Sequence, residues 1–121
     1  MIKNDNQWKM DYKFEKDGKY SFEIHFSDVI NNMNIFFQDG FDIIYLDFSN
    51  FDTSNVISMH CMFHECKNLK EIKGLNAFNT NKVTNICAMF QRCYELEYLD
   101  LSNFDTSNVI KMSYKFRDAI N

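Results

Sequence analysis

The chain has 121 residues, of which 45% are hydrophobic, and this is enough for one folded domain with a single core rather than a disordered segment. The net charge is −4, and lysines are mixed with aspartates and glutamates, so no basic patch suggests a nucleic-acid partner. No apolar run approaches the roughly 18–20 residues that a membrane-spanning helix needs, so membrane insertion is not expected.

Residues 1–28 are predicted to form an N-terminal β-hairpin that caps the rest of the chain. Apolar and polar residues alternate in YKFEKDGKYSFEIHF, residues 12–26, on both sides of Asp17-Gly18. An Asp-Gly pair between two alternating runs is a strong hairpin signal, because both turn positions favour positive φ. Trp8 and Met10 are candidates to close this cap.

Residues 29–121 are predicted to be an array of about four repeats. The segment SNFDTSNVI occurs at Ser49–Ile57 and again, unchanged, at Ser102–Ile110. A verbatim copy at this distance indicates stacked structural units rather than a catalytic motif. The corresponding first apolar anchors of the four units, which are separated by 26, 27 and 26 residues, are Ile30, Val56, Val83 and Val109.

Each unit is predicted to contain a short helix followed by a short strand. The apolar positions 56, 59, 62, 63 and 66 have the spacing of one helical face, and residues 52–54 (DTS) offer side-chain oxygens to cap its first turn. Further along, Leu99 and Leu101 alternate with polar residues, as in a half-buried strand. Neither element can bury its apolar face alone, so the units must stack. An inserted residue between Ile72 and Phe78, with Gly74 nearby, predicts a local bulge.

The stretches LEYLDLSNFDTSNVIKMSYKF, which begins at Leu96, and LDFSNFDTSNVISMHCMFHECKNLKEI, which begins at Leu46, resemble the BspA-like class of leucine-rich repeats. Its unit is close to LxxLDLSNFDTSNVTxMxxMFxxCxxL, and the match covers about residues 30–116. The resemblance implies an α/β solenoid with short parallel strands and one short helix per repeat. Its LxxLxL core would fall on Leu96, Leu99 and Leu101.

The same resemblance implies a function. Proteins of this class are common on bacterial and protist surfaces, where they are associated with adhesion and host-protein binding, and the repeat has no known catalytic activity. Residues 1–7, MIKNDNQ, are polar and lack the apolar segment of a signal peptide. The chain is therefore expected either to work inside a cell or to have lost a leader, while the resemblance favours the cell surface.

The outer face of the sheet is the predicted protein-binding surface, because side chains between the buried leucines project there. Tyrosine gives amphipathic contact area at low entropic cost, and it stands here beside small polar and charged residues. Three strands offer only a small area, so a simply hydrated face is the alternative. The candidate residues are Tyr45, Asp47, Ser49, Glu71, Lys73, Tyr98, Asp100 and Ser102.

The C-terminal end has no predicted cap, and uncapped repeat arrays tend to be insoluble or to bind a partner. Three explanations are open: an end-to-end dimer, a fragment of a longer array, or a last helix that serves as its own cap. Self-association as a homo-oligomer would use residues on the last face, namely Ile110, Tyr114 and Ile120.

The cysteines are expected to be reduced. Cys66 and Cys93 occupy one slot in consecutive units, roughly 5 Å apart at sheet spacing, so a disulfide is conceivable. Free cysteine, however, behaves readily as a small buried hydrophobe. Cys61 and Cys87 do not share a slot, which weakens the case for a disulfide framework.

No catalytic residue, metal site or cofactor is predicted. His60 and His64 are spaced as on one helical face, but Cys66 points to the core, so four ligands cannot converge and both histidines are expected to face solvent. Asp47 and Asp100 would lie roughly 10 Å apart, two strand spacings, as parts of a solvated ladder rather than an acid/base pair. The predicted function is therefore non-enzymatic binding of a protein partner.

Overall fold

The computed structural model describes residues 2–4, 7–9 and 29–114. Strand β1 (Ile2–Asn4) pairs antiparallel with β2 (Gln7–Lys9). Strand β3 (Tyr45–Asp47) pairs in parallel with β4 (Glu71–Lys73), which is followed by a short 3-10 helix, η1 (Leu75–Ala77). The predicted hairpin at residues 12–26 and Ile120 lie outside the described residues.

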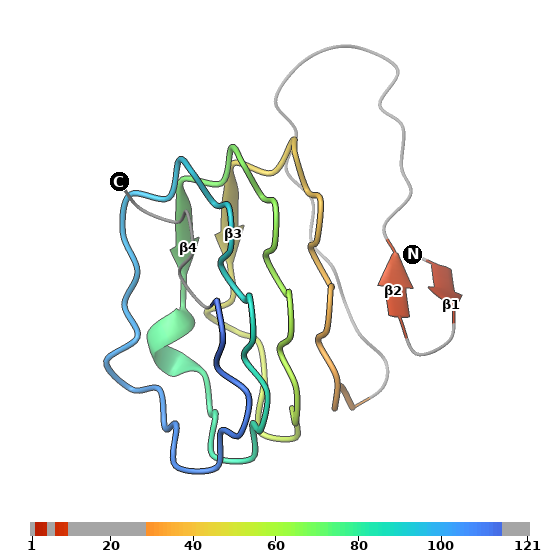
Figure 1. Cartoon of the computed structure of the whole chain (residues 1–121), viewed down its shortest axis with the longest axis vertical. Coiled ribbons are helices and arrows are strands. Elements are labelled where there is room, and N and C mark those ends of the chain that lie inside the picture. Colours follow the sequence, from red (N-terminus) through yellow and green to blue (C-terminus); the bar gives the residue numbers. More distant parts are fainter. Residues whose placement is uncertain (1, 5–6, 10–28, 115–121) are drawn as a thin grey trace.

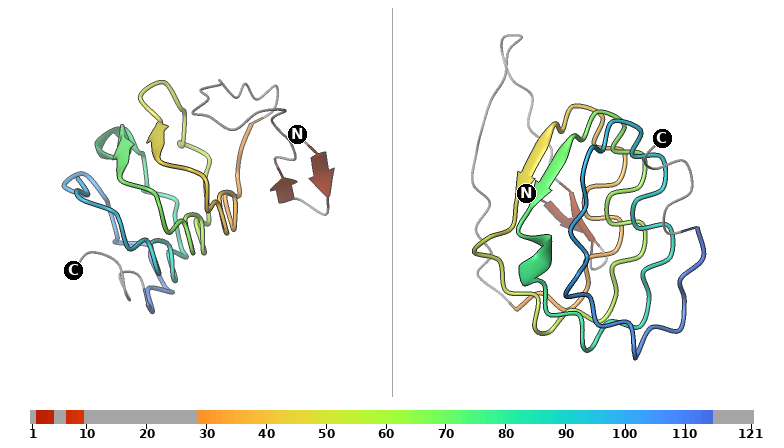
Figure 2. Two further views of the ribbon diagram at one scale, coloured as in Figure 1. Left: turned by 90° about the horizontal axis from the view of Figure 1, so that it is seen from above. Right: turned by 90° about the vertical axis from the view of Figure 1, so that its left-hand side faces the viewer.

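Residues 29–114 wind into successive turns that lie side by side (Figures 1 and 2). Two parallel ladders join these turns. One runs through Asn32, Ser58, Asn85 and Lys111, and the other joins β3 to β4 and continues from Glu71 to Tyr98. Partners in both ladders are 26 or 27 residues apart, so each sequence repeat occupies one turn of the chain.

The predicted helix of each unit is wrong for the described residues, where the segments after each anchor are runs of turns. In an α-helix every N–H donates four residues back along its own segment. Here alternate N–H groups donate to carbonyl oxygens of the next turn instead, at 2.9–3.0 Å in the middle of the chain. These bonds join Met59 to Asn85, Cys61 to Cys87, Phe63 to Met89 and Glu65 to Gln91.

The N–H groups that alternate with these donors close small turns within the unit. Met62 donates to the carbonyl of Met59 at 3.3 Å, and Cys66 donates to that of Phe63 at 3.1 Å. Cys61 has φ 53° and Glu65 has φ 62°. A positive φ at the third residue is what a type II turn requires, and outside glycine it costs roughly 1–2 kcal/mol per residue. The residues equivalent to Cys61 in the other turns, Ile35, Ala88 and Tyr114, also have positive φ. So do the residues equivalent to Glu65, which are Asp39 and Arg92.

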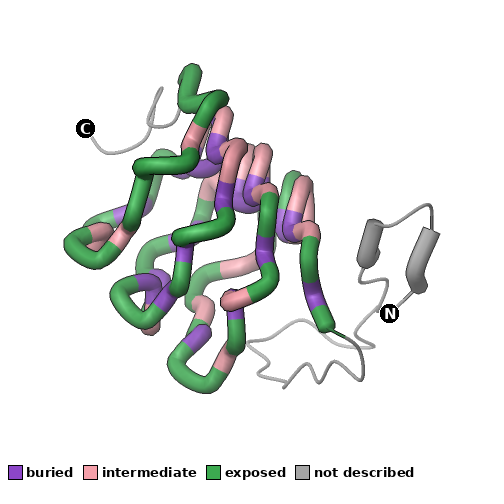
Figure 3. Tube along the Cα trace, turned by 90° about the horizontal axis from the view of Figure 1, so that it is seen from below, coloured by how far each residue is buried: buried purple, intermediate pink, exposed green. Residues whose placement is uncertain are grey.

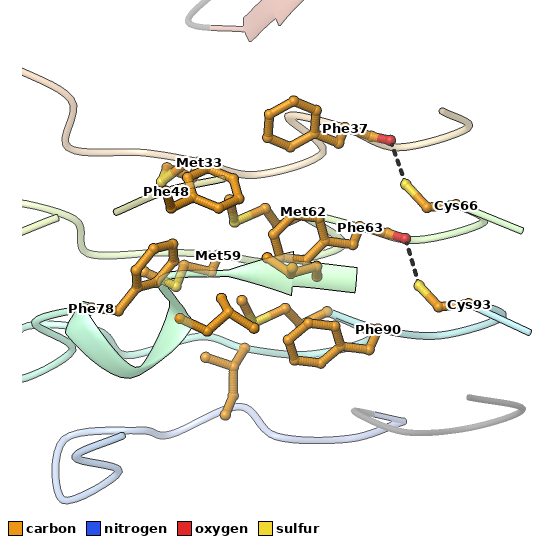
Figure 4. Packing of buried hydrophobic residues seen from close by; sticks show 14 of the residues in the cluster. Met33, Phe37, Phe48, Met59, Met62, Phe63, Cys66, Phe78, Phe90 and Cys93 are labelled. Carbon is orange, nitrogen blue, oxygen red and sulfur yellow. Dashed lines mark hydrogen bonds between the residues drawn. The ribbon is translucent and has the colours of Figure 1, made fainter. Parts of the chain in front are cut away.

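The core consists of like side chains stacked from turn to turn. The rings of Phe37 and Phe63 stack with centroids 5.8 Å apart, and those of Phe63 and Phe90 stack at 5.4 Å (Figure 4). Phe48, which follows β3, packs edge-on against Phe63 with ring centroids 5.9 Å apart. This contact connects the strand segment of the turn to the stacked phenylalanines. Buried residues recur at corresponding places in successive turns, and exposed residues dominate the outward loops (Figure 3).

The duplicated segment SNFDTSNVI forms a corner that is bonded to the next turn. Thr53 is only 2% exposed, and its hydroxyl accepts the N–H of Asn79 at 2.8 Å and donates to the Asn79 carbonyl at 3.3 Å. Thr80 makes the same pair of bonds to Asp105. The Asp52 carboxylate accepts the N–H of Ser54 at 2.9 Å, so the predicted capping bond is present, although it closes a turn and not a helix.

Gly74 lets the inserted part of the chain approach its neighbour closely. It has φ 84° and stands at the start of η1, where the sequence predicted a bulge. A Cβ atom at this position would lie 2.6 Å from the backbone nitrogen of Ser49. Both the left-handed conformation and the close approach therefore require glycine.

Replacing Thr53 by valine tests the corner. Thr53→Val keeps the shape but removes both bonds to Asn79, so the free energy of unfolding should fall by about 1–2 kcal/mol in a urea titration. Thr106→Val is the matched control, because Thr106 has the same neighbours in sequence but is exposed. Its effect should stay within about 0.5 kcal/mol. Equal losses in both variants would contradict the inter-turn role.

Candidate protein-binding surface

Three of the predicted binding residues form one row across neighbouring turns. The register of the parallel pair sets Tyr45 opposite Glu71, and a further bridge sets Glu71 opposite Tyr98. Tyr45 is 50% exposed and Tyr98 is 66% exposed, and Glu71 between them is also exposed. The structure therefore brings two tyrosines together on either side of a carboxylate.

Asp47 and Lys73 form the next row and are paired with each other. They are opposite in the β3–β4 register, and Lys73 Nζ lies 3.4 Å from Asp47 Oδ2. Asp47 Oδ1 also accepts the N–H of Ser49 at 2.8 Å. The pKa of Asp47 is lowered, first by its hydrogen bonds with Ser49 and further by the charge of Lys73. This carboxylate is therefore ionised and held in place at neutral pH.

Asp100 repeats the arrangement of Asp47 two turns later. Its Oδ1 accepts the hydroxyl of Ser102 at 2.6 Å and the N–H of Ser102 at 3.1 Å, and these bonds lower its pKa. A catalytic acid needs a raised pKa, and two carboxylates sharing a proton would show one. Asp47, at the end of β3, and Asp100, two residues after the bridge at Tyr98, instead both hold serine turns. Of the eight predicted residues, Asp100 alone is half-buried, and the other seven are exposed.

Exposed apolar side chains just before the strands were missed by sequence reasoning. Phe41 and Tyr94 are both exposed, and they share a slot with Lys67, whose Nζ lies 5.2 Å from the centre of the Phe41 ring. Extending the 26–27-residue period to the loops before the strands would have found them. Ile44 is also exposed, next to Tyr45. We call Phe41, Ile44, Tyr45, Tyr94 and Tyr98 the aromatic face.

The last described turn is less covered than the earlier ones. Val56 and Val83 are fully buried, whereas the corresponding Val109 is half-buried. Ile110 is 82% exposed and Tyr114 is 59% exposed, and these are the two described members of the predicted self-association site.

The four cysteines are free thiols, in agreement with the reduced interpretation. Cys66 Sγ donates to the carbonyl of Phe37 at 3.0 Å, and Cys93 Sγ donates to that of Phe63 at 3.1 Å (Figure 4). Burial raises the pKa of each of these two thiols to about 12. Both are therefore neutral at physiological pH and serve as donors that tie one turn to the previous one.

The two histidines of HCMFHEC are half-buried, which corrects the prediction that they face solvent. His60 Nδ1 lies 3.0 Å from the carbonyl oxygen of Cys87 in the next turn, so its ring packs along the neighbouring backbone. Among the residues that the structure describes, no three His, Cys, Asp or Glu side chains are placed to hold a metal ion. Within the same residues, no helix is long and apolar enough to cross a membrane.

Thiol alkylation should separate the cysteines into two classes. With a pKa of about 12, only about one Cys66 or Cys93 thiol in 10⁴ is ionised at pH 8, and the thiolate is the reactive form. Iodoacetamide, followed by mass spectrometry, should modify both at least ~100-fold more slowly than Cys87 in the folded protein. In urea all four should react alike. Fast native alkylation of Cys66 or Cys93 would contradict the buried donor role.

A family model described as a Mycoplasma protein of unknown function, DUF285, matches residues 31–121. This range is more than half of the chain and contains all the stacked turns from β3 onward. Comparisons with curated proteins and with solved structures give no match. The chain therefore belongs to the DUF285 family of Mycoplasma proteins of unknown function.

Proposed function

We propose that this chain is a non-enzymatic, adhesion-type module that binds another protein through the outer side of its parallel strands. The proposal takes the stacked turns as a short solenoid of the BspA-like leucine-rich-repeat type, without the helix that this resemblance implies for each repeat. The observation that carries it is the row of Tyr45, Glu71 and Tyr98, with both tyrosines at least half exposed on hydrogen-bonded strands. Tyrosine is enriched in the residues that dominate protein interfaces.

Rigid display is the proposed mechanism. Backbone hydrogen bonds between turns hold the row of tyrosines in register, and the Asp47–Lys73 pair is formed before any partner arrives. A surface that is ordered in advance loses little conformational entropy on binding, so more of the contact energy remains as affinity. The aromatic face also includes Phe41, Ile44 and Tyr94, which are exposed in the segments before the row, and exposed apolar side chains often mark interaction sites.

The chemistry of the charged residues supports binding rather than catalysis. The two aligned carboxylates, Asp47 and Asp100, have lowered pKa values and are engaged with serine turns. The partner that we propose is a protein; the mixed charges of the face, with Lys73 beside Asp47 and Glu71, do not suit a nucleic-acid backbone.

Self-association through the C-terminal end is a second candidate. It is favoured by the exposure of Ile110 and Tyr114 in a turn whose anchor, Val109, is less buried than its equivalents. In this alternative the chain is a structural subunit or array fragment, and the aromatic face is hydrated.

Paired variants distinguish the two candidates. Immobilised wild-type protein and Tyr45→Ala/Tyr98→Ala would be incubated with candidate surface proteins, and retention would be quantified. Loss of two interface tyrosines should weaken a bound protein by about 30-fold or more, the effect of at least ~2 kcal/mol. Ile110→Ser/Tyr114→Ser is the matched control and should bind normally.

The reverse result would replace the proposal by its alternative. Retention that survives Tyr45→Ala/Tyr98→Ala would contradict binding through the strands. Light scattering should find the wild type monomeric at all concentrations under the main proposal. A concentration-dependent dimer that Ile110→Ser/Tyr114→Ser dissociates would instead establish the structural role.

A further inference from the structure

Cys61 and Cys87 lie side by side in neighbouring turns, although they do not share a slot in the repeat. The N–H of Cys61 donates to the carbonyl oxygen of Cys87 at 3.0 Å. Parallel backbones run about 4.8 Å apart, and Cys87 lies one residue, about 3.3 Å, along from the position opposite Cys61. The Cα atoms of the two cysteines are therefore about 5.8 Å apart, within the roughly 4.4–6.8 Å that a disulfide spans.

His60 is placed to assist chemistry at the Cys61 thiol. Its Nδ1 lies 3.0 Å from the Cys87 carbonyl oxygen. A carbonyl only accepts hydrogen bonds, so Nδ1 carries the ring proton and Nε2 of the neutral ring keeps its lone pair. Cys61 Sγ lies 3.4 Å from this Nε2 and 3.6 Å from Nδ1, so the sulfur lies beside the imidazole ring and not in line with either nitrogen. The neighbouring turn thus sets the tautomer that leaves Nε2 as the basic nitrogen of a ring adjacent to Cys61.

The four thiols differ in how available they are. The sulfurs of Cys66 and Cys93 are buried, and each donates to a different backbone carbonyl. Cys61 and Cys87 are both half-buried, so small oxidants in solution can reach them. Burial raises the pKa of the Cys61 thiol, and interaction with Cys87 raises it further.

We propose that Cys61 and Cys87 form a redox modification site, in which a hydroperoxide converts the two thiols into a disulfide between adjacent turns, with His60 as the base. This proposal does not depend on the proposed protein-binding function. It assigns a chemical role to the HCMFHEC segment, which the binding surface does not use.

The reaction balances with peroxide as the only oxidant. The Cys87 thiol loses its proton to solvent as its sulfur attacks one peroxide oxygen and the O–O bond breaks. The hydroxide or alkoxide that leaves takes up a proton from solvent, so Cys87 becomes a sulfenic acid and water or an alcohol is released. Cys61, whose pKa is raised by burial, then gives its proton to His60 Nε2 as its sulfur attacks the sulfur of Cys87. The hydroxide that leaves takes up this proton and becomes water. Two thiols lose two electrons in total, and these electrons reduce the O–O bond.

Peroxide treatment of the full chain tests the site. The protein would be incubated with hydrogen peroxide at pH 7.5, free thiols would be blocked with iodoacetamide, and peptides would be mapped without reduction. We expect a Cys61–Cys87 cross-link within one chain, with Cys66 and Cys93 still reduced. The oxidised protein should also melt at a higher temperature than the reduced protein, because the bond ties two turns together.

Variants separate the chemistry from a merely structural effect. Cys61→Ser should leave Cys87 as a sulfenic acid that a dimedone probe captures, and the cross-link should be absent. His60→Gln should slow cross-linking by at least ~10-fold and remove its pH dependence near neutrality, as loss of a general base predicts. His64→Gln is the matched control and should behave as wild type, because His64 has no contact with either thiol among the described hydrogen bonds.

Several outcomes would overturn the proposal. These are a cross-link between Cys66 and Cys93, links only between chains, or oxidation of Cys61 and Cys87 to sulfinic acids without a bond. Equal rates in His60→Gln, His64→Gln and the wild type would remove His60 from the reaction. Circular dichroism of each variant in its reduced form shows whether the fold is retained, so a loss of cross-linking in a folded variant is a result about the site.

Discussion

The hydrogen bonds from alternate N–H groups of one turn to carbonyl oxygens of the next are the interaction on which this structure depends. They recur after each anchor, as in Met33 to Ser58, Met59 to Asn85 and Ile86 to Lys111. Because they set the register between turns, equivalent residues meet in space. The stacked phenylalanines, the buried threonine corners and the row of tyrosines all follow from that register, and none of them would form between turns that were free to slide.

Much of this arrangement was predictable from the period alone. The repeat of 26–27 residues identified buried positions such as Val56, Met59 and Phe63 correctly, whereas in the last described turn Val109 is half-buried and Met112 is exposed. The backbone conformation was not predictable, because successive small turns place apolar residues inward at the same spacing as a helix. Positive φ distinguishes these turns from a helix. It occurs at Cys61 and Glu65, and neither residue type predicts a left-handed conformation as glycine would. Hydrogen bonds to the next turn offset the strain of these positive φ angles. Such bonds join residues far apart in the sequence, so the local pattern of apolar residues does not predict them.

Some residues of the candidate sites could likewise be predicted from the sequence, and others could not. Tyr45 and Tyr98 could be found from the sequence because strand alternation and the period agree there. Phe41 and Tyr94 were missed because only strand residues were considered. The proximity of Cys61 to Cys87 was hidden for a physical reason: the slot equivalent to Cys61 is Ala88, so alignment of the repeats sets Cys87 one position away. The hydrogen bond between their backbones shows the pairing that alignment does not.

The central claim is that these segments bond to their neighbours and not along a helix. An NMR experiment that detects couplings through hydrogen bonds tests it most directly, since it links each amide nitrogen to the carbonyl carbon that accepts from it. The account predicts couplings from the nitrogens of Cys61, Phe63 and Glu65 to the carbonyl carbons of Cys87, Met89 and Gln91. Couplings from the same nitrogens to carbonyls four residues earlier in the chain would show an α-helix and contradict it.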